Sequence, residues 1–520
     1  MASAAAKLAR AGAAGAAAAA QRGGRTAPRA GRPGEIALLP VGALTSKPYA
    51  FTARPWEIRR TESIDVSDGV GSNIRVDYKE TEVMRVLPRE NSDINAEWIH
   101  DKARFSYDGL KRQRLDQPYK AVGGGDASLT PISWPEALEA AAELVSKPTT
   151  FVLGRSVDLE TAVAVKDLAA RMGNARLYRE GGGGVEDDHP NYLKLTDVDE
   201  ADVVLLVGIN PRLEATMLNL RLRKRSLEGG LTVGIVGPPA DLTYDAQCFG
   251  LHPEHLVRIA EGRHPFCQAL AQAERPLVLY GSGVLERDDG ESVVRLLKSI
   301  NPHLQGGEAE NVVHLASSHA NDAGLTALYV EPLPTGDGGI AASDSETFYL
   351  VDLCDTALAA QLKAQGKVVV YQGTHGDENL VGCDMLLPGA AFVEKEGTYI
   401  NMEGRPQRTA KVYNPPGVGR EDWKIVRALS QSLGGACTLP YDDAQQMAQR
   451  VATLVPAPVD QYTKSGVGTI AGTPSEARVW NTPLPPLVGD FYRTDAVSKA
   501  SVVMAKTSAA RRKLETNFPL

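Results

Sequence analysis

The sequence predicts an α/β protein with doubly wound, mostly parallel sheets in two lobes, preceded by a small mixed domain. Two observations predict this fold class. From residue 149 onward, short runs that are apolar on both faces alternate with amphipathic stretches of helical period, which is typical of parallel strands covered by helices on both sides. The chain also has 520 residues, 43% of them hydrophobic, enough for several domains with large cores.

The predicted strands follow one another at intervals that leave room for helices between them. They are residues 149–154, 202–208, 231–237, 276–281, 311–316, 348–353 and 367–373. Helices are predicted at 159–172 and around 215–226. The Gly-, Asp- and Pro-rich run at 332–345 indicates a joint, so we expect a first α/β lobe at 121–335 and a second at 336–440.

The segments on either side have a different character. Residues 35–120 contain short strand-like runs at 73–78 and 82–86 rather than alternating strands and helices, and we expect a small mixed domain there. Residues 441–520 are expected to form an extended and helical tail. No run of about 18 apolar residues occurs, so no membrane-spanning helix is predicted.

The first 34 residues are rich in Ala and Gly, carry spaced basic residues and contain no acidic residue. This composition is typical of a mitochondrial presequence, whose positive charge responds to the membrane potential. Chloroplast targeting and a plain Ala/Gly tail are the alternatives. The whole chain has 56 basic and 64 acidic residues, and this acidic balance argues against a nucleic-acid partner.

Cysteine and histidine provide few candidate ligands. The five cysteines are Cys248, Cys267, Cys354, Cys383 and Cys437, and no two form a C-x-x-C pair, so neither a disulfide framework nor a cysteine-ligated cluster is predicted. The spacing of His252, His255, His264 and Cys267 resembles that of a zinc site. We favour the alternative that Pro253 and Pro265 shape turns around locally hydrogen-bonded histidines.

Two further groups could be interpreted as catalytic. His375 and Asp377 follow a predicted strand, the position where α/β enzymes place catalytic groups, but we favour a role in turn and interface packing. Glu394, Glu396 and Glu403 could form a carboxylate cluster, although solvation or pairing with Arg405 is the simpler interpretation. The glycine runs lack the G-x-G-x-x-G spacing of a dinucleotide site.

Residues 62–110 contain S63-IDVSDGVGSNI-74 and I99-HDKARF-105, which resemble the [4Fe–4S] domain of molybdopterin oxidoreductases. In that family, three cysteines lie in a short loop and a fourth lies downstream. The resemblance aligns these ligands with Asp65, Asp68, Ser72 and His100. Iron–sulfur clusters need thiolates, so the resemblance implies a cluster-less domain on a molybdopterin-oxidoreductase-like fold.

Further runs occur in one order along the chain: TARPWE at 52–57, ISWPEAL at 132–138, residues 207–224 and 371–407, and FYRTDAVSKASVVMAK at 491–506. Together they resemble the 75-kDa, large peripheral-arm subunit of mitochondrial complex I (NADH:ubiquinone oxidoreductase) over about residues 36–510. Complete members of that family begin with a ferredoxin-like region carrying [2Fe–2S] and [4Fe–4S] clusters. That region ends in a Cys-Pro-Val-Gly-Ala-Leu-Thr-Ser-Lys-Pro run, and here Leu39 replaces its cysteine.

The resemblance therefore implies a split subunit whose iron–sulfur half is a separate partner chain. It implies a structural and assembly role in the matrix-facing peripheral arm at the mitochondrial inner membrane. No catalytic, cofactor-binding or metal-binding residue is expected in this chain, and no nucleic acid or direct membrane span. The alternatives are a molybdenum- or tungsten-pterin oxidoreductase that has lost its cluster, and a free-standing binding module outside complex I.

Overall fold

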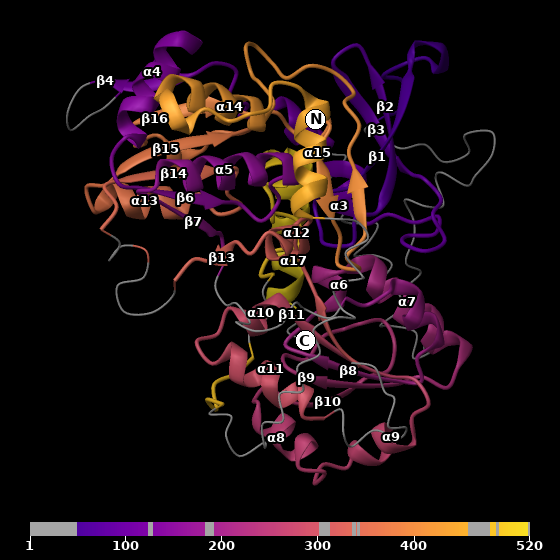
Figure 1. Cartoon of the computed structure of the whole chain (residues 1–520). Helices are drawn as coiled ribbons and strands as arrows, with labels where there is room; N and C mark the ends of the chain where they lie inside the picture. The colour runs from indigo at the N-terminus through magenta and orange to yellow at the C-terminus, as the bar shows by residue number, and fades with distance from the viewer. Residues whose placement is uncertain are drawn as a thin grey trace.

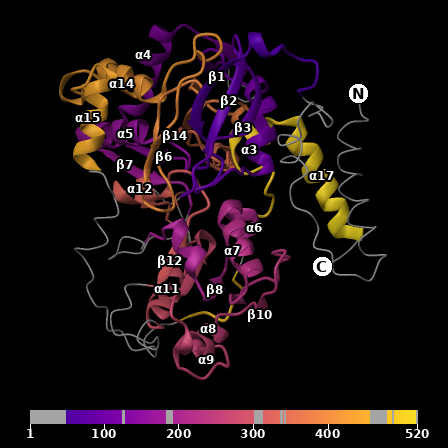
Figure 2. The same ribbon diagram turned by 90° about the vertical axis from the view of Figure 1, so that its right-hand side faces the viewer.

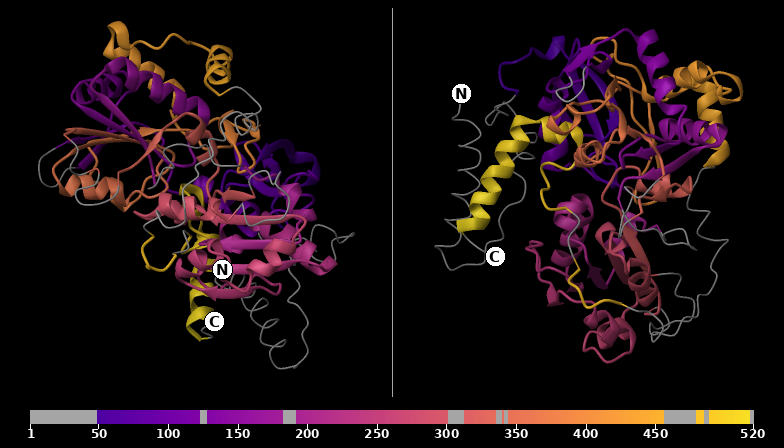
Figure 3. Two further views of the ribbon diagram at one scale, coloured as in Figure 1. Left: turned by 60° about the horizontal axis from the view of Figure 1, so that its bottom comes forward. Right: turned by 90° about the vertical axis from the view of Figure 1, so that its left-hand side faces the viewer.

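The computed structural model describes residues 49–122, 128–181, 192–300, 312–334, 340, 344–455, 479–484 and 488–517. The predicted presequence and Leu39 lie outside the described residues. Two large sheets form separate lobes, and a small three-stranded sheet lies beside the upper lobe (Figure 1). Figure 3 shows the same two lobes from other sides. The predicted α/β class, with mostly parallel sheets in two lobes behind a small domain, is confirmed.

The small domain is an antiparallel sheet with one covering helix. Its strands are β1 (Arg59–Ile64), β2 (Asn73–Lys79) and β3 (Glu82–Pro88), preceded by the 3-10 helix η2 (Pro55–Glu57) and followed by α3 (Asp101–Phe105) and η3 (Ser106–Lys111). Alternate residues of β2, such as Ile74 and Val76, are buried against Ile99 and Leu110, because successive side chains of a strand point to opposite faces. This pairing fixes the loop between β1 and β2.

The upper lobe is built on an eight-stranded sheet. Its order is β13 (Glu331–Pro332), β7 (Ala175–Arg179), β6 (Thr149–Leu153), β14 (Thr347–Val351), β15 (Val368–Gly373), β16 (Met385–Pro388), β4 (Tyr119–Val122) and β5 (Ser128–Pro131). The first six strands in this order are parallel to one another. At the other edge of the sheet, β4 pairs with β16 and β5 pairs with β4, both in antiparallel orientation. A hairpin of β17 (Thr398–Ile400) and β18 (Pro406–Arg408) lies beside this lobe.

Helices cover both faces of this sheet. One face packs against α4 (Trp134–Val145), α5 (Leu159–Met172), α14 (Asp422–Leu433) and α15 (Ala444–Leu454), and the other packs against α13 (Ala357–Ala364). Local signals set the helix ends. Ser133 and Glu136 form a capping box at the start of α4. Asp158 caps α5, which ends at Gly173 in the left-handed conformation.

The lower lobe is a five-stranded, fully parallel sheet. Its order is β10 (Gln247–Gly250), β9 (Thr232–Val236), β8 (Val203–Val207), β11 (Pro276–Gly281) and β12 (Val313–Ala316). One face is covered by α7 (Thr216–Glu228), and the other by α8 (Glu254–Ala260), α9 (Cys267–Gln272) and α11 (Gly290–Lys298). Shorter helices are α6 (Pro211–Glu214), α10 (Ser282–Leu285) and α12 (Asp322–Ala327).

The strand order divides the chain differently from the predicted lobes at 121–335 and 336–440. The five-stranded sheet occupies the middle of the chain, and β6 and β7 before it share a sheet with β13 to β16 after it. β6 pairs directly with β14, with Thr149 opposite Thr347. The error has a physical cause, because a buried parallel strand has the same apolar pattern whichever strand it pairs with.

The carboxy-terminal segment returns to the small domain. It contains α16 (Ala496–Ala500) and α17 (Val502–Asn517), which pack against η3 and α3. The Asp108 carboxylate accepts hydrogen bonds from Ser501 Oγ and from the Val502 amide. Figure 2 shows α17 extending along the outside of the molecule. In the part of the chain that the structure describes, no helix has both the length and the apolar character needed to cross a bilayer.

Candidate functional site

The loop between β1 and β2 holds three of the residues that the sequence aligned with cluster ligands, and the fourth lies at the start of α3. His100 Nε2 lies 2.9 Å from Asp65 Oδ2 and 3.2 Å from Asp68 Oδ2. All four residues, including Ser72, are buried. Ser72 closes the loop, since its carbonyl oxygen accepts a hydrogen bond of 2.8 Å from the Asp65 amide.

The ring of His100 is oriented by the helix that it caps. Its Nδ1 accepts a hydrogen bond of 3.0 Å from the Ala103 amide in the first turn of α3. In the neutral imidazole, the proton therefore sits on Nε2, which faces Asp65 and Asp68. Sequence comparison alone could not reveal this dual role, because histidine is not a common capping residue.

Two effects on the charge of His100 oppose each other. Burial disfavours its charged form, but the carboxylates of Asp68 and Asp65 outweigh burial and raise the pKa of His100 to about 9. Protonation of Nδ1, however, would point its N–H group at the N–H group of Ala103, and the hydrogen bond between these two nitrogens would be lost. The capping bond requires a neutral ring, whereas the two carboxylates favour the imidazolium, so these two sets of contacts oppose each other.

The donor set does not fit an iron–sulfur cluster, because it offers carboxylates, an imidazole and a hydroxyl in place of thiolates. A single divalent ion would accept two carboxylates and one imidazole, and Asp65, Asp68 and His100 are the one such group found among the described residues. These three side chains contact one another directly and, with the bond from His100 to the Ala103 amide, form a hydrogen-bonded plug that fastens the loop to α3.

Lys102 ties this plug to the carboxy-terminal segment. Its buried ammonium donates hydrogen bonds to the Ser67 carbonyl at 2.7 Å and to Thr494 Oγ1 at 2.6 Å. It also lies 5.1 Å from the ring centroid of Phe491. The positive charge therefore stands beside the two buried carboxylates and partly balances them.

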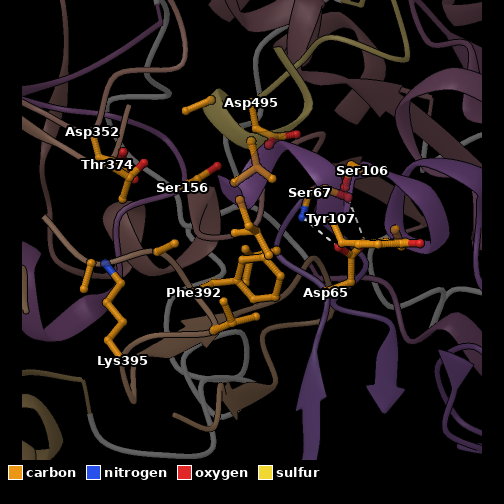
Figure 4. A pocket seen from close by; sticks show the side chains of 18 of the residues that line it. Asp65, Ser67, Ser106, Tyr107, Ser156, Asp352, Thr374, Phe392, Lys395 and Asp495 are labelled. Carbon is orange, nitrogen blue, oxygen red and sulfur yellow. Dashed lines mark hydrogen bonds between the residues drawn. The ribbon is translucent and has the colours of Figure 1, made fainter. Parts of the chain in front are cut away.

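A second polar region lies where the parallel strands of the upper lobe end, the edge at which open α/β sheets bind ligands. Ser156, Asp352 and Thr374, just beyond β6, β14 and β15, line a cavity of about 60 Å³. Figure 4 shows Asp352 and Thr374 on one side of this cavity and Asp65 and Ser67 on the other. The cavity has room for a few water molecules, whereas ligand pockets span about 300–1,000 Å³. This cavity is therefore too small for a pterin cofactor.

Buried ion pairs occupy this edge. Lys395 Nζ lies 2.6 Å from Asp158 Oδ2 and 2.7 Å from Asp422 Oδ2, and all three residues are buried. Burial alone would lower the pKa of Lys395, but the two carboxylates outweigh burial and hold its pKa well above the ordinary value. Gln372 completes the network by donating to Asp422 Oδ1 at 3.1 Å.

Asp352 is the exception at this edge, because its Oδ1 atom is enclosed without a hydrogen-bond partner. Its backbone is left-handed, with φ of 44°, and burial raises the pKa of its carboxyl group to about 7. The main chain is tightly packed here, since a Cβ atom on Gly154 would approach the Asp352 carbonyl oxygen to 1.9 Å. No sequence pattern indicated Lys395, Asp158, Asp422 or Asp352, because their partners come from distant segments.

Arg155, at the end of β6, joins the two lobes. Its guanidinium lies 3.0 Å from Glu286 Oε1 of the lower lobe and 3.6 Å from Asp322 Oδ1. Burial alone would raise the pKa of Asp322, but Arg155 and His319 outweigh it and hold that pKa below the ordinary range. The junction between the lobes therefore depends on a buried arginine and two acids.

The zinc-like group makes local contacts. His252 Nδ1 lies 3.2 Å from the Asn481 carbonyl oxygen, His264 Nδ1 accepts from the Phe266 amide at 3.2 Å, and Cys267 Sγ lies 3.4 Å from the Ile259 carbonyl oxygen. The rings of His255 and His264 meet edge to face. The structure does not bring these four residues together as a set of metal ligands.

The remaining candidates have packing partners. His375 lies 2.8 Å from Thr374 Oγ1 and 3.1 Å from the Gly109 carbonyl oxygen, and burial with nearby Arg114 lowers its pKa to about 4. Asp377 caps a 3-10 helix instead of facing His375.

The three glutamates do not form a cluster. Glu394 makes a bidentate pair with Arg114, with both distances 2.6 Å. Glu403 lies 3.6 Å from Arg405, and exposed Glu396 pairs with Arg408 at 3.4 Å.

Three protein-family models match parts of this chain. The family model "Molybdopterin oxidoreductase" matches residues 114–432. Residues 58–108 match "NADH-ubiquinone oxidoreductase NDSU1/NuoG-like, 4Fe-4S domain", and residues 460–507 match the model for the C-terminal region of the G-type subunit of NADH-ubiquinone oxidoreductase. The fold is similar to that of acetylene hydratase from Pelobacter acetylenicus, with a TM-score of 0.54 and 13% identity, covering 88% of this chain and 82% of that one.

Curated relatives match over nearly the whole chain. The mitochondrial NADH dehydrogenase [ubiquinone] iron-sulfur protein 1 of Solanum tuberosum is 42% identical over 92% of this chain and 65% of its own length. The NADH-ubiquinone oxidoreductase 75 kDa subunit of Reclinomonas americana is 39% identical over 91% of this chain and 72% of its own length. This chain thus spans about two thirds of the length of these relatives. It belongs to the family of the 75-kDa subunit of NADH-ubiquinone oxidoreductase, within the molybdopterin oxidoreductase fold.

Proposed function

We propose that this chain is a structural and assembly subunit of mitochondrial complex I. It would support electron transfer from NADH to ubiquinone by packing against a polypeptide that carries the iron–sulfur clusters. The observation that carries the proposal is the combination of 39–42% identity to subunits of this enzyme with a donor set at 65–100 that lacks thiols. We infer that no redox centre belongs to this chain.

The proposed role is mechanical. Electron transfer between clusters needs fixed spacing and exclusion of solvent, and a large, tightly packed body supports both. The plug at Asp65, Asp68 and His100 and the ion pairs around Lys395 would keep both former cofactor positions rigid without a cofactor. The buried Arg155 contacts would hold the lobes together.

The clusters are proposed to lie on a separate chain, at the matrix-facing side of the mitochondrial inner membrane. This proposal is supported by Leu39, which stands in a Pro-Val-Gly-Ala-Leu-Thr-Ser-Lys-Pro run where the family has a cysteine, and by the basic segment ahead of it. Leucine cannot ligate iron, so the partner chain would supply that ligand. The partner set would include the other peripheral-arm subunits.

Two measurements test the proposal. In detergent-solubilised mitochondrial membranes, the epitope-tagged chain should co-migrate with NADH dehydrogenase activity on native gels. After mild dissociation, iron and sulfide should remain with other polypeptides, and the isolated chain should contain neither iron nor molybdenum in stoichiometric amount. Stoichiometric molybdenum on the isolated chain would instead support the pterin-enzyme alternative, and migration apart from the complex would support a free-standing binding module.

A further inference from the structure

A short segment at the amino-terminal side of the small domain, residues 51–60, exposes two large aromatic side chains. Phe51 is 104% and Trp56 is 80% exposed. Soluble proteins seldom leave neighbouring large aromatics in water, and such patches mark interaction sites. Trp is also among the residues most enriched at the centres of protein interfaces.

This segment is ordered despite its exposure. The Arg54 amide donates to Glu57 Oε2 at 3.0 Å across the short helix η2, and Glu57 pairs with Lys79 of β2 at 3.2 Å. Phe51 has a left-handed backbone with φ of 65°, a conformation that is unfavourable for an aromatic residue. The contacts of Arg54, Glu57 and Lys79 thus tie the backbone of this segment to β2, while Phe51 and Trp56 remain exposed.

The segment is also positively charged. Arg54, Arg59 and Arg60 are exposed, and no ion pair of theirs is found among the described residues. The nearby acids are already engaged, since Glu57 pairs with Lys79 and Glu62 with Arg89 at 3.3 Å. A complementary surface would therefore combine an apolar recess with acidic side chains.

The adjacent strand offers backbone groups to a partner. β1 is an edge strand whose residues pair with β2 on one side only. In the described part of the chain, no strand other than β2 is hydrogen-bonded to β1, although β18 packs against part of it, and an edge with free backbone groups can bind an extended peptide. Figure 2 shows the small sheet at the end of the molecule remote from the lower lobe. These backbone groups favour a polypeptide partner over a lipid surface.

We propose that residues 51–60 are the docking surface for the iron–sulfur-bearing polypeptide, through Phe51, Trp56 and the three arginines. This inference rests on the proposed function. The carboxy-terminal family match lies at 460–507 and the 4Fe-4S match begins at residue 58. In the family that the sequence resembles, the ferredoxin-like region precedes the 4Fe-4S domain, so a partner equivalent to that region would meet the molecule beside residue 58, where the 4Fe-4S match begins.

Site-directed photocrosslinking in the assembled complex tests this assignment. The full chain, tagged and carrying benzoylphenylalanine in place of Trp56, is irradiated in mitochondria and its crosslinked peptides are sequenced. We expect crosslinks to a cysteine-rich polypeptide with ferredoxin-like cluster motifs. The matched control places the same probe at Trp480, which is 52% exposed and bonded to Asp289 of the lower lobe, and should not yield that product.

Two double variants add an independent measurement. Phe51→Ser with Trp56→Ser, and Arg59→Glu with Arg60→Glu, should each lower the fraction of chain in the complex at least tenfold. The melting temperature of the isolated chain should stay unchanged, because these side chains are exposed. Leu227→Ser removes another exposed apolar side chain, 73% exposed on α7, and should leave assembly intact.

The outcomes separate the two proposals. If the chain co-migrates with NADH dehydrogenase but residue 56 crosslinks to lipid, to another protein or to nothing, the docking assignment is wrong and the structural role stands. Normal assembly of both double variants would overturn the docking assignment in the same way. If the chain does not co-migrate with the enzyme at all, the proposed function itself is wrong.

Discussion

Two polar regions of the molecule, the loop between β1 and β2 and the carboxyl edge of the upper sheet, are built in different ways. At the loop between β1 and β2, His100 places one nitrogen against two carboxylates of a single short loop. At the carboxyl edge of the upper sheet, Lys395 joins Asp158 and Asp422 from separate helices. The first group thus comes from one loop and the helix that follows it, whereas the second joins segments that are remote in the sequence.

The largest loss of stability is expected from a substitution in the ion-pair network at the carboxyl edge of the upper sheet. Lys395→Met would leave Asp158 and Asp422 as buried carboxylates without their cation, and the free energy of unfolding should fall by about 3–5 kcal/mol. Chemical denaturation of the purified chain measures this change. Lys424→Met, which removes an exposed pair with Glu421 on the same helix, should cost less than about 0.5 kcal/mol. Equal losses in both variants would contradict the importance of the buried network.

The junction between the lobes should respond nearly as strongly. Arg155→Met removes the buried partner of Asp322 and Glu286 and should destabilise the chain by about 3 kcal/mol near neutral pH. The pKa of Asp322 is depressed in the folded state, so its stabilisation is complete above the unfolded value of about 4 and is lost as pH falls below it. The difference in the free energy of unfolding between wild type and variant should therefore become smaller in acid. A difference in unfolding free energy that grows below pH 4 would contradict the pairing of Arg155 with Asp322.

A smaller loss of stability is expected at His100, which contacts the loop between β1 and β2. His100→Ser keeps an acceptor for the Ala103 amide but removes the Nε2–H donor, so it should cost about 1–3 kcal/mol. The pH dependence identifies the protonation state. A neutral tautomer predicts a constant difference from pH 7 to 10. An imidazolium with a pKa raised to about 9 would contribute below its unfolded value of about 6.5 and lose that contribution as pH rises through 9. Thermal unfolding across this range distinguishes the two.

The smallest expected effect is a gain in stability, from a substitution at Asp352. Burial raises the folded-state pKa of Asp352 to about 7, so the folded chain binds an extra proton between about pH 4 and 7, and stability falls as pH rises through this window. Asp352→Asn removes that dependence, but its buried amide also lacks a partner and offsets most of the gain, so the chain should be stabilised by about 1 kcal/mol above pH 7. Asparagine tolerates the left-handed backbone, so no strain is added. A variant less stable than wild type at pH 8 would contradict the unpartnered state of this carboxylate.

Local structure followed from local chemistry. Strands such as β6 and β8 were predicted within a residue or two, because a run that is apolar on both faces has few stable arrangements other than a covered parallel strand. The grouping of Asp65, Asp68 and Ser72 was also predictable, since they lie in one short loop between paired strands. The capping bond of His100, which decides what its other nitrogen can do, was not.

The sequence alone determined the family and the α/β class, because these depend on residue identity and short-range order. Only the tertiary structure decided that strands β8 to β12 form a separate sheet, which lies between β7 and β13 in the sequence. It also decided that Lys395 bridges two helices and that Phe51 and Trp56 remain in water. Strand neighbours, buried ion pairs and uncovered surfaces depend on which distant segments meet, and no local pattern specifies that.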